Sequence, residues 1–258
     1  MYDLKHRVAF ITGGAQGIGR AIAVELAKAG ADIVIAQRDI NKVADAIEEI
    51  KSIGREALAV QVDVTDKLSI KDGVKKALGQ FDTIDILVNN AGYAESMAEA
   101  TTLDDLDRCY DVNLKGVWRV TSELVPHFKA NKSGKIINIS STAGRIGSAE
   151  LMAYGASKAA LNNLTQSLAC ELGPYKVNVN AICPALIRTE MSEKTLPTLG
   201  INTSDDYDKF VKGFTLLNCV LVPEDVANAV VFFASPASNN ITGQILNVDG
   251  GGLLNSGL

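Results

Sequence analysis

Short apolar runs alternate with longer amphipathic segments along the 258 residues, and this alternation restricts the possible folds more than any other feature. The apolar runs, which we predict to be strands, are Arg7–Thr12, Asp32–Ala36, Ala57–Val62, Ile84–Val88, Lys135–Ile139, Val177–Ile182 and Gln244–Val248. The segments with helical spacing are Gly17–Ala29, Asn41–Ile53, Leu68–Leu78, Leu103–Lys129, Ala153–Leu172 and Glu224–Ala234. Short apolar strands separated by helices indicate a parallel sheet with helices on both faces.

The order of these segments predicts a single α/β domain over residues 1–258. Right-handed crossovers between parallel strands produce a doubly wound sheet, here of seven strands. No tract rich in proline, glycine and serine divides the chain. The stretch from about 187 to 221 interrupts the alternation and contains Pro197, Gly200 and Gly213. Because long irregular insertions in compact domains often cover a binding site, we predict a substrate-binding loop there.

Composition excludes several classes of function. The hydrophobic fraction is 47% and the net charge is −5, with no basic patch of the kind that binds nucleic acid. No apolar run is long enough to span a membrane, and no apolar signal core follows the amino terminus, so we expect a cytoplasmic protein. The two histidines and four cysteines lack metal-ligand spacing. We therefore expect no metal site and buried, reduced thiols.

A glycine-rich turn follows the first predicted strand. Gly13, Gly17 and Gly19 allow a tight turn, while Gln16 and Ile18 flank the start of the next helix. The free N–H groups and positive dipole end of such a helix attract a pyrophosphate. Any strand-to-helix turn can use glycine, but the position after the first strand of an alternating chain favours a dinucleotide.

The residues that end the second predicted strand bear on the choice of cofactor. An acid at this point would accept a hydrogen bond from a ribose 2′-hydroxyl and repel a 2′-phosphate, but position 37 is a neutral Gln37. The guanidinium of Arg38 can pair with a 2′-phosphate. The sequence therefore favours NADP(H) and leaves NAD(H) possible. Arg38 could instead be solvated or stack on adenine, and a shifted register could bring Asp39 to the ribose.

Tyr154 and Lys158 are four residues apart in a predicted helix, which places them on one face. An ammonium about 5 Å from a phenol favours the phenolate by roughly two pKa units at an effective dielectric of about 20. This pair therefore predicts a tyrosine that exchanges protons near neutral pH. The alternative is a surface tyrosine that happens to lie beside a lysine.

These motifs together resemble the short-chain dehydrogenase/reductases over nearly the whole chain. The matching residues are Thr12–Gly19, Asp63–Val64, Asn89–Gly92, Asn113, Ser141, Tyr154, Lys158 and Pro184–Thr189. The resemblance implies a Rossmann fold and a nicotinamide cofactor. One departure is the pair Pro184-Ala185, where the family usually has Pro-Gly. A methyl group there could narrow the space near the nicotinamide.

The resemblance also implies roles for single residues. The implied catalytic residues are Asn113, Ser141, Tyr154 and Lys158, with Ser140 as a rival of Ser141 that the family's usual offset disfavours. The implied cofactor-binding residues are Gly13, Gln16, Gly17, Ile18, Gly19, Gln37, Arg38, Asp63, Val64, Asn90, Ala91, Gly92, Tyr154, Lys158, Pro184, Ile187 and Thr189. Asp63 resembles the acid that binds the adenine amino group, and Asn113 the residue that completes a proton relay through a water.

The expected activity is reversible hydride transfer between NADP(H) and a small-molecule secondary alcohol or ketone, with Tyr154 as general acid/base. The alternative is a non-catalytic regulator or scaffold that binds NAD(P) on the same fold. A sugar-nucleotide epimerase or dehydratase is disfavoured, because such chains usually carry a larger C-terminal domain. Family members commonly pair the helices at 103–129 and 159–172 between subunits, so we expect a homotetramer.

Overall fold

A seven-stranded parallel sheet forms the centre of the molecule in the computed structural model, which describes residues 2–95, 101–189, 192 and 200–255. The strands are β1 (Val8–Thr12), β2 (Asp32–Gln37), β3 (Ala57–Gln61), β4 (Ile86–Asn89), β5 (Gly134–Ile139), β6 (Val177–Pro184) and β7 (Ile245–Val248). Their order is β3-β2-β1-β4-β5-β6-β7, and every pairing is parallel. The predicted doubly wound α/β sheet is thus confirmed.

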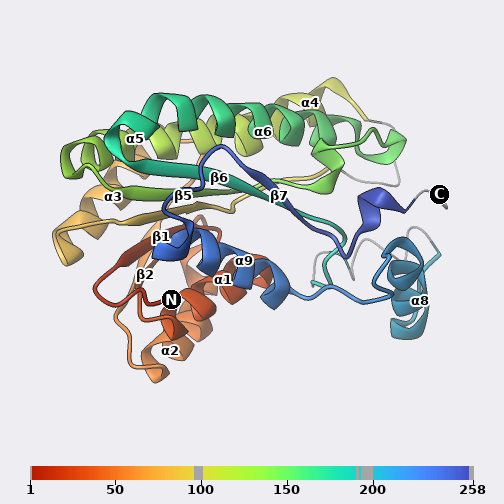
Figure 1. Cartoon of the computed structure of the whole chain (residues 1–258), viewed down its shortest axis with the longest axis horizontal. Coiled ribbons are helices and arrows are strands. Elements are labelled where there is room, and N and C mark those ends of the chain that lie inside the picture. The colour runs from red at the N-terminus through yellow and green to blue at the C-terminus, as the bar shows by residue number, and fades with distance from the viewer. Residues whose placement is uncertain (1, 96–100, 190–191, 193–199, 256–258) are drawn as a thin grey trace.

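Helices cover both faces of this sheet (Figure 1). One layer holds α1 (Gly17–Lys28), α2 (Ala44–Ser52) and α9 (Pro223–Ala234), and the other holds α3 (Lys67–Phe81), α4 (Leu103–Tyr110), α5 (Val117–Asn131) and α6 (Met152–Leu172). α8 (Ser204–Phe214) lies beyond the carboxyl ends of the strands, near the C-terminal segment. In the described part of the chain, no helix is both long and apolar enough to cross a membrane.

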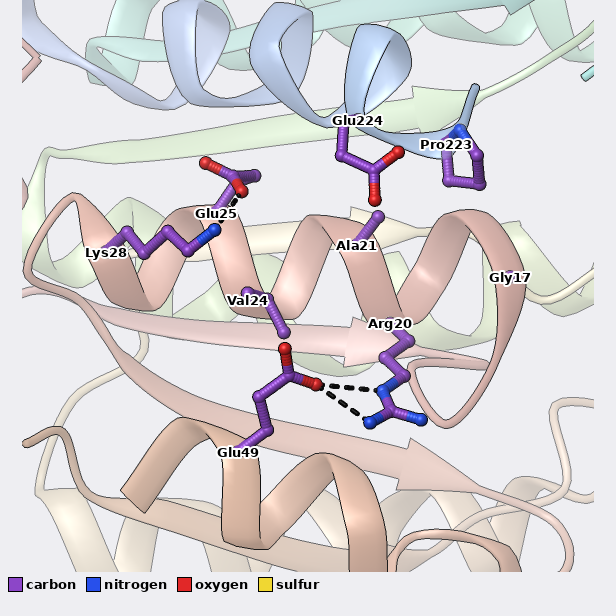
Figure 2. A pocket seen from close by; sticks show the side chains of 9 residues that line it. All are labelled: Gly17, Arg20, Ala21, Val24, Glu25, Lys28, Glu49, Pro223 and Glu224. Atoms are coloured by element: carbon purple, nitrogen blue, oxygen red, sulfur yellow. Dashed lines mark hydrogen bonds and ion pairs between the residues drawn. The ribbon is translucent and has the colours of Figure 1, made fainter. Parts of the chain in front are cut away.

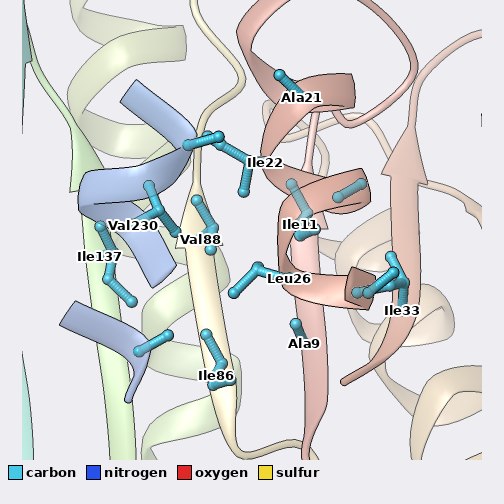
Figure 3. Packing of buried hydrophobic residues seen from close by; sticks show 14 of the residues in the cluster. Ala9, Ile11, Ala21, Ile22, Leu26, Ile33, Ile86, Val88, Ile137 and Val230 are labelled. Carbon is cyan, nitrogen blue, oxygen red and sulfur yellow. The ribbon is translucent and has the colours of Figure 1, made fainter. Parts of the chain in front are cut away.

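The core is divided between the two faces by the alternation of each strand. Ala9 and Ile11 of β1 belong to the cluster under α1 and α9, whereas Val8 and Phe10 belong to the cluster under α3, α5 and α6. Successive side chains of a strand point to opposite faces, so a strand buried on both sides is apolar throughout. Figure 3 shows the first cluster, in which Ile22 and Leu26 of α1 pack over the sheet.

The order of the strands indicates which edge of the sheet would bind a ligand. β1 lies between β2 and β4, so the connections leave β1 in opposite directions. In doubly wound sheets the crevice at the carboxyl ends of the strands around this point binds the ligand. The turns after β1, β4, β5 and β6, which contain most of the predicted site residues, all lie at that edge.

The prediction of one continuous helix over Leu103–Lys129 was wrong in detail. The structure divides it into α4, a π-helical segment at Asp111–Gly116, and α5. A π segment inserts an extra residue into the helical repeat, and such segments are frequent at functional sites. The described part of the expected loop at 187–221 contains α8 and a parallel bridge between Ile187 and Leu221.

Candidate active site

The glycine turn after β1 has the backbone geometry that the sequence predicted. Gly13 and Gly17 have φ of +68° and +52°, a region that residues with a side chain rarely adopt. A Cβ atom on Gly19 would overlap the carbonyl oxygen of Gly13. Gln16 is the N-cap of α1 and makes no side-chain capping bond, so the first N–H groups of α1 remain available to an anion. Ile18 packs against the core below.

Thr12 and Asn90 join this turn to the end of β4. The Thr12 hydroxyl accepts hydrogen bonds from the backbone N–H groups of Asn90 and Ala91, both at 3.0 Å. In return, the Asn90 side-chain amide donates to the carbonyl oxygens of Thr12 and Gly13, also at 3.0 Å. The side chain of Asn90 therefore fixes the turn, and a cofactor contact by Asn90 would fall to its main chain.

The end of β2 presents a neutral side chain and an exposed cation. The Oε1 atom of Gln37 is buried and has no hydrogen-bond partner in the described structure. Arg38 is exposed, and its guanidinium forms no ion pair with any described residue. Asp39 caps the following turn by accepting from the Asn41 N–H, and it lies 4.0 Å from the Lys42 ammonium. Its carboxylate is thus engaged away from the strand end.

Asp63 lies in the turn after β3. Its carboxylate accepts hydrogen bonds from the N–H and hydroxyl of Thr65, at 2.9 and 2.7 Å. Burial acts to raise the pKa of Asp63, but these hydrogen bonds and the charges of Arg38 and Arg119 give a net lowering. The neighbouring Val64 packs closely against Gly116 of the π segment. Asp63 is therefore an anionic acceptor at the adenine end of the predicted cofactor path.

Ser141 and Tyr154 are brought together at the end of β5. The Ser141 hydroxyl lies near enough to the half-buried Tyr154 phenol to lower the pKa of that phenol through hydrogen bonding. The rival Ser140 is buried and donates to the carbonyl oxygen of Lys158 at 3.1 Å, so its hydroxyl is engaged elsewhere. Lys158 is 4% exposed, donates to the carbonyl oxygen of Ile139 at 2.8 Å, and has its ammonium 5.5 Å from the centre of the Tyr154 ring.

The expected lowering of the Tyr154 pKa by Lys158 was wrong for the protein alone. Burial raises the pKa of Tyr154 to about 12, and the hydrogen bond from Ser141 offsets only part of this. Burial also lowers the pKa of Lys158 to about 8. Lys158 therefore loses its proton before Tyr154 does, so it carries no charge where the phenol titrates. Desolvation outweighs the attraction between charges that the sequence argument had used.

Asn113 lies in the π segment and ties three elements together. Its amide oxygen accepts from the N–H of Tyr93 at 2.8 Å, and its amide nitrogen donates to the carbonyl of Tyr93 and to the Ser157 hydroxyl at 2.8 and 2.9 Å. Ser157 donates in turn to the carbonyl of Tyr154 at 2.7 Å. Gly92 lies close to the side chains of both Asn113 and Lys158. Asn113 thus links the segment after β4 to α6.

The turn after β6 closes the candidate site. The carbonyl of Pro184 accepts from the Thr142 hydroxyl at 3.3 Å, and the N–H of Ala185 donates to Val248 at 3.2 Å, so the departure from Pro-Gly fits a regular strand ending. Ile187 is buried, and Thr189 is the nearest neighbour of a Cβ placed on Gly17. This turn therefore faces the start of α1.

Two residues that the sequence analysis did not select contact this cluster. Ser157 lies directly before Lys158, inside the Tyr154–Lys158 motif, and its position could have been noticed. Glu95, three residues after Gly92, is 5% exposed and accepts hydrogen bonds from the main chain at the start of α6. No local pattern distinguishes Glu95 from the other acids of the chain, since it lies in a segment without regular structure.

A groove of about 190 Å³ lies along the outer face of α1, between α2 and α9 (Figure 2). Its charged side chains are largely paired with one another: Arg20 binds Glu49, and Lys28 binds Glu25. It includes Gly17 at one end but none of the catalytic residues proposed from sequence. The cluster around Tyr154, rather than this groove, carries the groups needed for chemistry.

Comparisons with known proteins agree with this arrangement. The family pattern described as short chain dehydrogenase matches residues 7–200. A 3-oxoacyl-acyl-carrier-protein reductase of Thermotoga maritima is 34% identical, covering 96% of this chain and 98% of that protein. A versicolorin reductase of Emericella nidulans is 35% identical, covering 97% of each. The structure of a 7α-hydroxysteroid dehydrogenase complexed with NADH and 7-oxoglycochenodeoxycholic acid superimposes with a TM-score of 0.88 at 30% identity, covering 97% of this chain and 96% of that one.

Proposed function

Because this chain belongs to the short-chain dehydrogenase family, we propose that it transfers a hydride between NADP(H) and a secondary alcohol or ketone. The family places it among oxidoreductases that act on alcohol and keto groups and bind NAD(P)(H). The observation that carries the finer proposal is the contact of Tyr154 with Ser141, one helical turn from the buried Lys158.

The residues present fit a dinucleotide. The positive φ of Gly13 and Gly17, the close approach at Gly19 and the uncapped start of α1 form a cradle for a pyrophosphate. The unpartnered Oε1 of Gln37 marks a buried acceptor where a ribose would lie. Gln16, Ile18, Asp63, Val64, Asn90, Ala91, Gly92, Pro184, Ile187 and Thr189 would complete the site. When bound, NAD(P)(H) supplies or accepts the hydride.

Tyr154 acts as general acid in reduction and general base in oxidation. Its phenol stays protonated over the physiological range, because its pKa is raised to about 12, and is therefore ready to donate to a carbonyl oxygen. Ser141, already in contact with the phenol, offers a second hydrogen bond to the same oxygen. Two donors directed at one developing alkoxide stabilise it in the manner of an oxyanion site.

Lys158 and Asn113 act on either side of Tyr154. Lys158 would bind the nicotinamide ribose hydroxyls through its ammonium, which is charged below a pKa of about 8. Asn113 holds the carbonyl of Tyr154 through Ser157 and would pass protons to solvent through a bound water. Both assignments come from the resemblance to the family, and the buried hydrogen bonds of the cluster are compatible with them.

The preference for NADP(H) rests on the end of β2. Arg38 offers an exposed guanidinium to a 2′-phosphate, and the carboxylate of Asp39 accepts from the Asn41 N–H and lies 4.0 Å from the Lys42 ammonium, which partly offsets its charge. The relative solved with NADH shows that the family also accommodates the unphosphorylated cofactor. The neutral acceptor Gln37 is compatible with either.

The experiment compares initial rates with NADPH and NADH across a panel of ketones. We expect NADPH to be preferred, and Arg38→Ala to reduce the preference roughly ten- to hundredfold, since a charge-assisted contact contributes about 1.5–3 kcal/mol. Lys42→Ala removes a neighbouring exposed charge and is the control. A tenfold advantage for NADH in the unaltered protein would refute the cofactor proposal. Cofactor binding without turnover of any ketone would instead favour the regulator or scaffold.

The assembly is proposed to be a homotetramer. Trp118 of α5 and Leu103 of α4 are 48% and 79% exposed, and both lie in the helix layer that family members use between subunits. Burial of this surface against a second copy would explain it. A monomer mass by light scattering would refute the assignment.

A further inference from the structure

The buried carboxylate of Glu95 lies against the first turn of α6. Its two oxygens accept hydrogen bonds from the N–H of Ala153 at 2.9 Å and from the N–H of Tyr154 at 3.0 Å. The thiol of Cys109 donates to the same carboxylate at 3.5 Å. Among the described residues, no lysine or arginine forms an ion pair with Glu95. A carboxylate this deeply buried, with main-chain donors as its partners, requires an explanation beyond surface charge.

α6 needs this carboxylate because the helix has no cap of its own. Leu151 is its N-cap and has no side-chain acceptor, so the first N–H groups would be unsatisfied in a buried setting. A negative charge at a helix N-terminus is also favourable toward the helix dipole. Glu95 supplies both, and it does so at the main-chain nitrogen of Tyr154 itself.

We propose that Glu95 is a positioning residue, which fixes the main chain of Tyr154 and places a negative charge beside the first turn of α6. The inference rests on the proposed role of Tyr154 as general acid/base. It adds a second hold on that residue: Ser157 binds the carbonyl of Tyr154 from one side, and Glu95 binds its N–H from the other.

The segment that contains Glu95 also connects the start of α6 to the proposed cofactor site. It follows directly after Asn90–Gly92, and the main chain of Tyr93 is fixed by Asn113. One short segment therefore contacts the glycine turn, the π segment and the start of α6. A shift of this segment would move Tyr154, and small displacements of a catalytic group are costly.

The electrostatic surroundings of the phenol make the proposal measurable. The groups acting on Tyr154 are the hydrogen bond from Ser141, which lowers its pKa, and the charges of Cys109, Cys183 and Glu95, which raise it further beyond the effect of burial. Lys158 faces the ring at 5.5 Å. Removing only the charge of Glu95 should therefore make Tyr154 ionise at lower pH.

Three variants separate position from charge. Glu95→Ala removes the cap, Glu95→Gln keeps the shape and one acceptor oxygen but not the charge, and Glu150→Gln alters an exposed acid just before the same helix as the control. We expect Glu95→Ala to lower kcat roughly tenfold or more with little change in KM for the ketone, as for a misplaced catalytic group. Glu95→Gln should lose less, and Glu150→Gln nothing. Unchanged kcat in Glu95→Ala would overturn the proposal.

A second readout uses the cofactor-free protein. Carbon-13 labelling of the tyrosine ring carbon that bears the hydroxyl gives one signal for Tyr154, assigned by its loss in Tyr154→Phe. We expect this signal to begin to titrate at lower pH in Glu95→Gln than in the unaltered protein. A folded Glu95→Gln with an unchanged titration would show a merely structural cap and overturn the proposal. Full turnover in Tyr154→Phe would instead overturn the proposed function and leave this titration standing.

Discussion

At the residue scale, burial shifts the pKa values of Lys158 and Tyr154 in opposite directions, and these shifts govern the chemistry of Tyr154. Lys158 has its pKa lowered to about 8 and Tyr154 has its pKa raised to about 12, both by burial. Because the ammonium loses its proton first, it does not stabilise a phenolate in the protein alone. The phenol is instead a firmly protonated donor at neutral pH. That state suits the reduction of a ketone, in which Tyr154 gives up its proton.

Lys135, which lies away from the candidate site, also has its pKa lowered by burial, and the effect can be tested through protein stability. Its ammonium donates to the side chains of Asn178, Ser238 and Asn239 at 2.9–3.2 Å, and burial lowers its pKa to about 8, with a smaller effect of Arg7. Between pH 8 and the unfolded value near 10.5, the unfolded chain holds a proton that the folded one lacks, so the free energy of unfolding rises with pH there.

Lys135→Met should remove this slope. We expect the difference in unfolding free energy between the variant and the unaltered protein to shift against the variant by roughly 1–2 kcal/mol between pH 7.5 and 10. Urea unfolding at several pH values measures it, with Lys71→Met of α3 as an exposed control for loss of a positive charge. A pH-independent difference would contradict the lowered pKa.

At the scale of elements, the glycine turn and the start of α1 depend on close backbone approach. Gly19→Ala would bring a Cβ atom onto the carbonyl oxygen of Gly13 and close to the Asn90 amide. We expect loss of cofactor binding and a lower melting temperature. Gly79→Ala is the matched control, since it lies inside α3 with no heavy atom within 4 Å of the added Cβ and should stabilise the protein by up to about 1 kcal/mol. Calorimetry and cofactor titration of both variants test this; equal behaviour would contradict the assigned turn.

The π segment shows where prediction of elements from sequence ends. The apolar spacing over Leu103–Lys129 continues through Asp111–Gly116, so periodicity gives one helix and no sign of the widened turn. That widening accompanies the contacts of Asn113 with Tyr93 and Ser157, which join residues distant in sequence. Long-range contacts of this kind leave no local pattern.

For the whole molecule, the alternation of strands and helices was sufficient to predict the sheet. Strands whose side chains are buried on both faces of the sheet require helices on both faces. Right-handed crossovers then leave few possible orders of the strands in the sheet. The sheet edge in turn brings the turns after β1, β4, β5 and β6 together, so residues named from separate motifs meet in one cluster. Two features could not be predicted from the sequence in this way. One is that burial outweighs the charge of Lys158 in setting the pKa of Tyr154. The other is that the Glu95 carboxylate accepts hydrogen bonds from the first turn of α6.

The central claim is that Tyr154 exchanges the substrate proton, and Tyr154→Phe tests it most directly. The decisive measurement is kcat for reduction of an accepted ketone at saturating NADPH, with cofactor affinity measured in parallel by fluorescence titration. We predict that cofactor binding is retained and that kcat falls roughly 10²–10⁴-fold, the usual contribution of a general acid. A variant that binds cofactor normally and keeps most of its turnover would contradict the account.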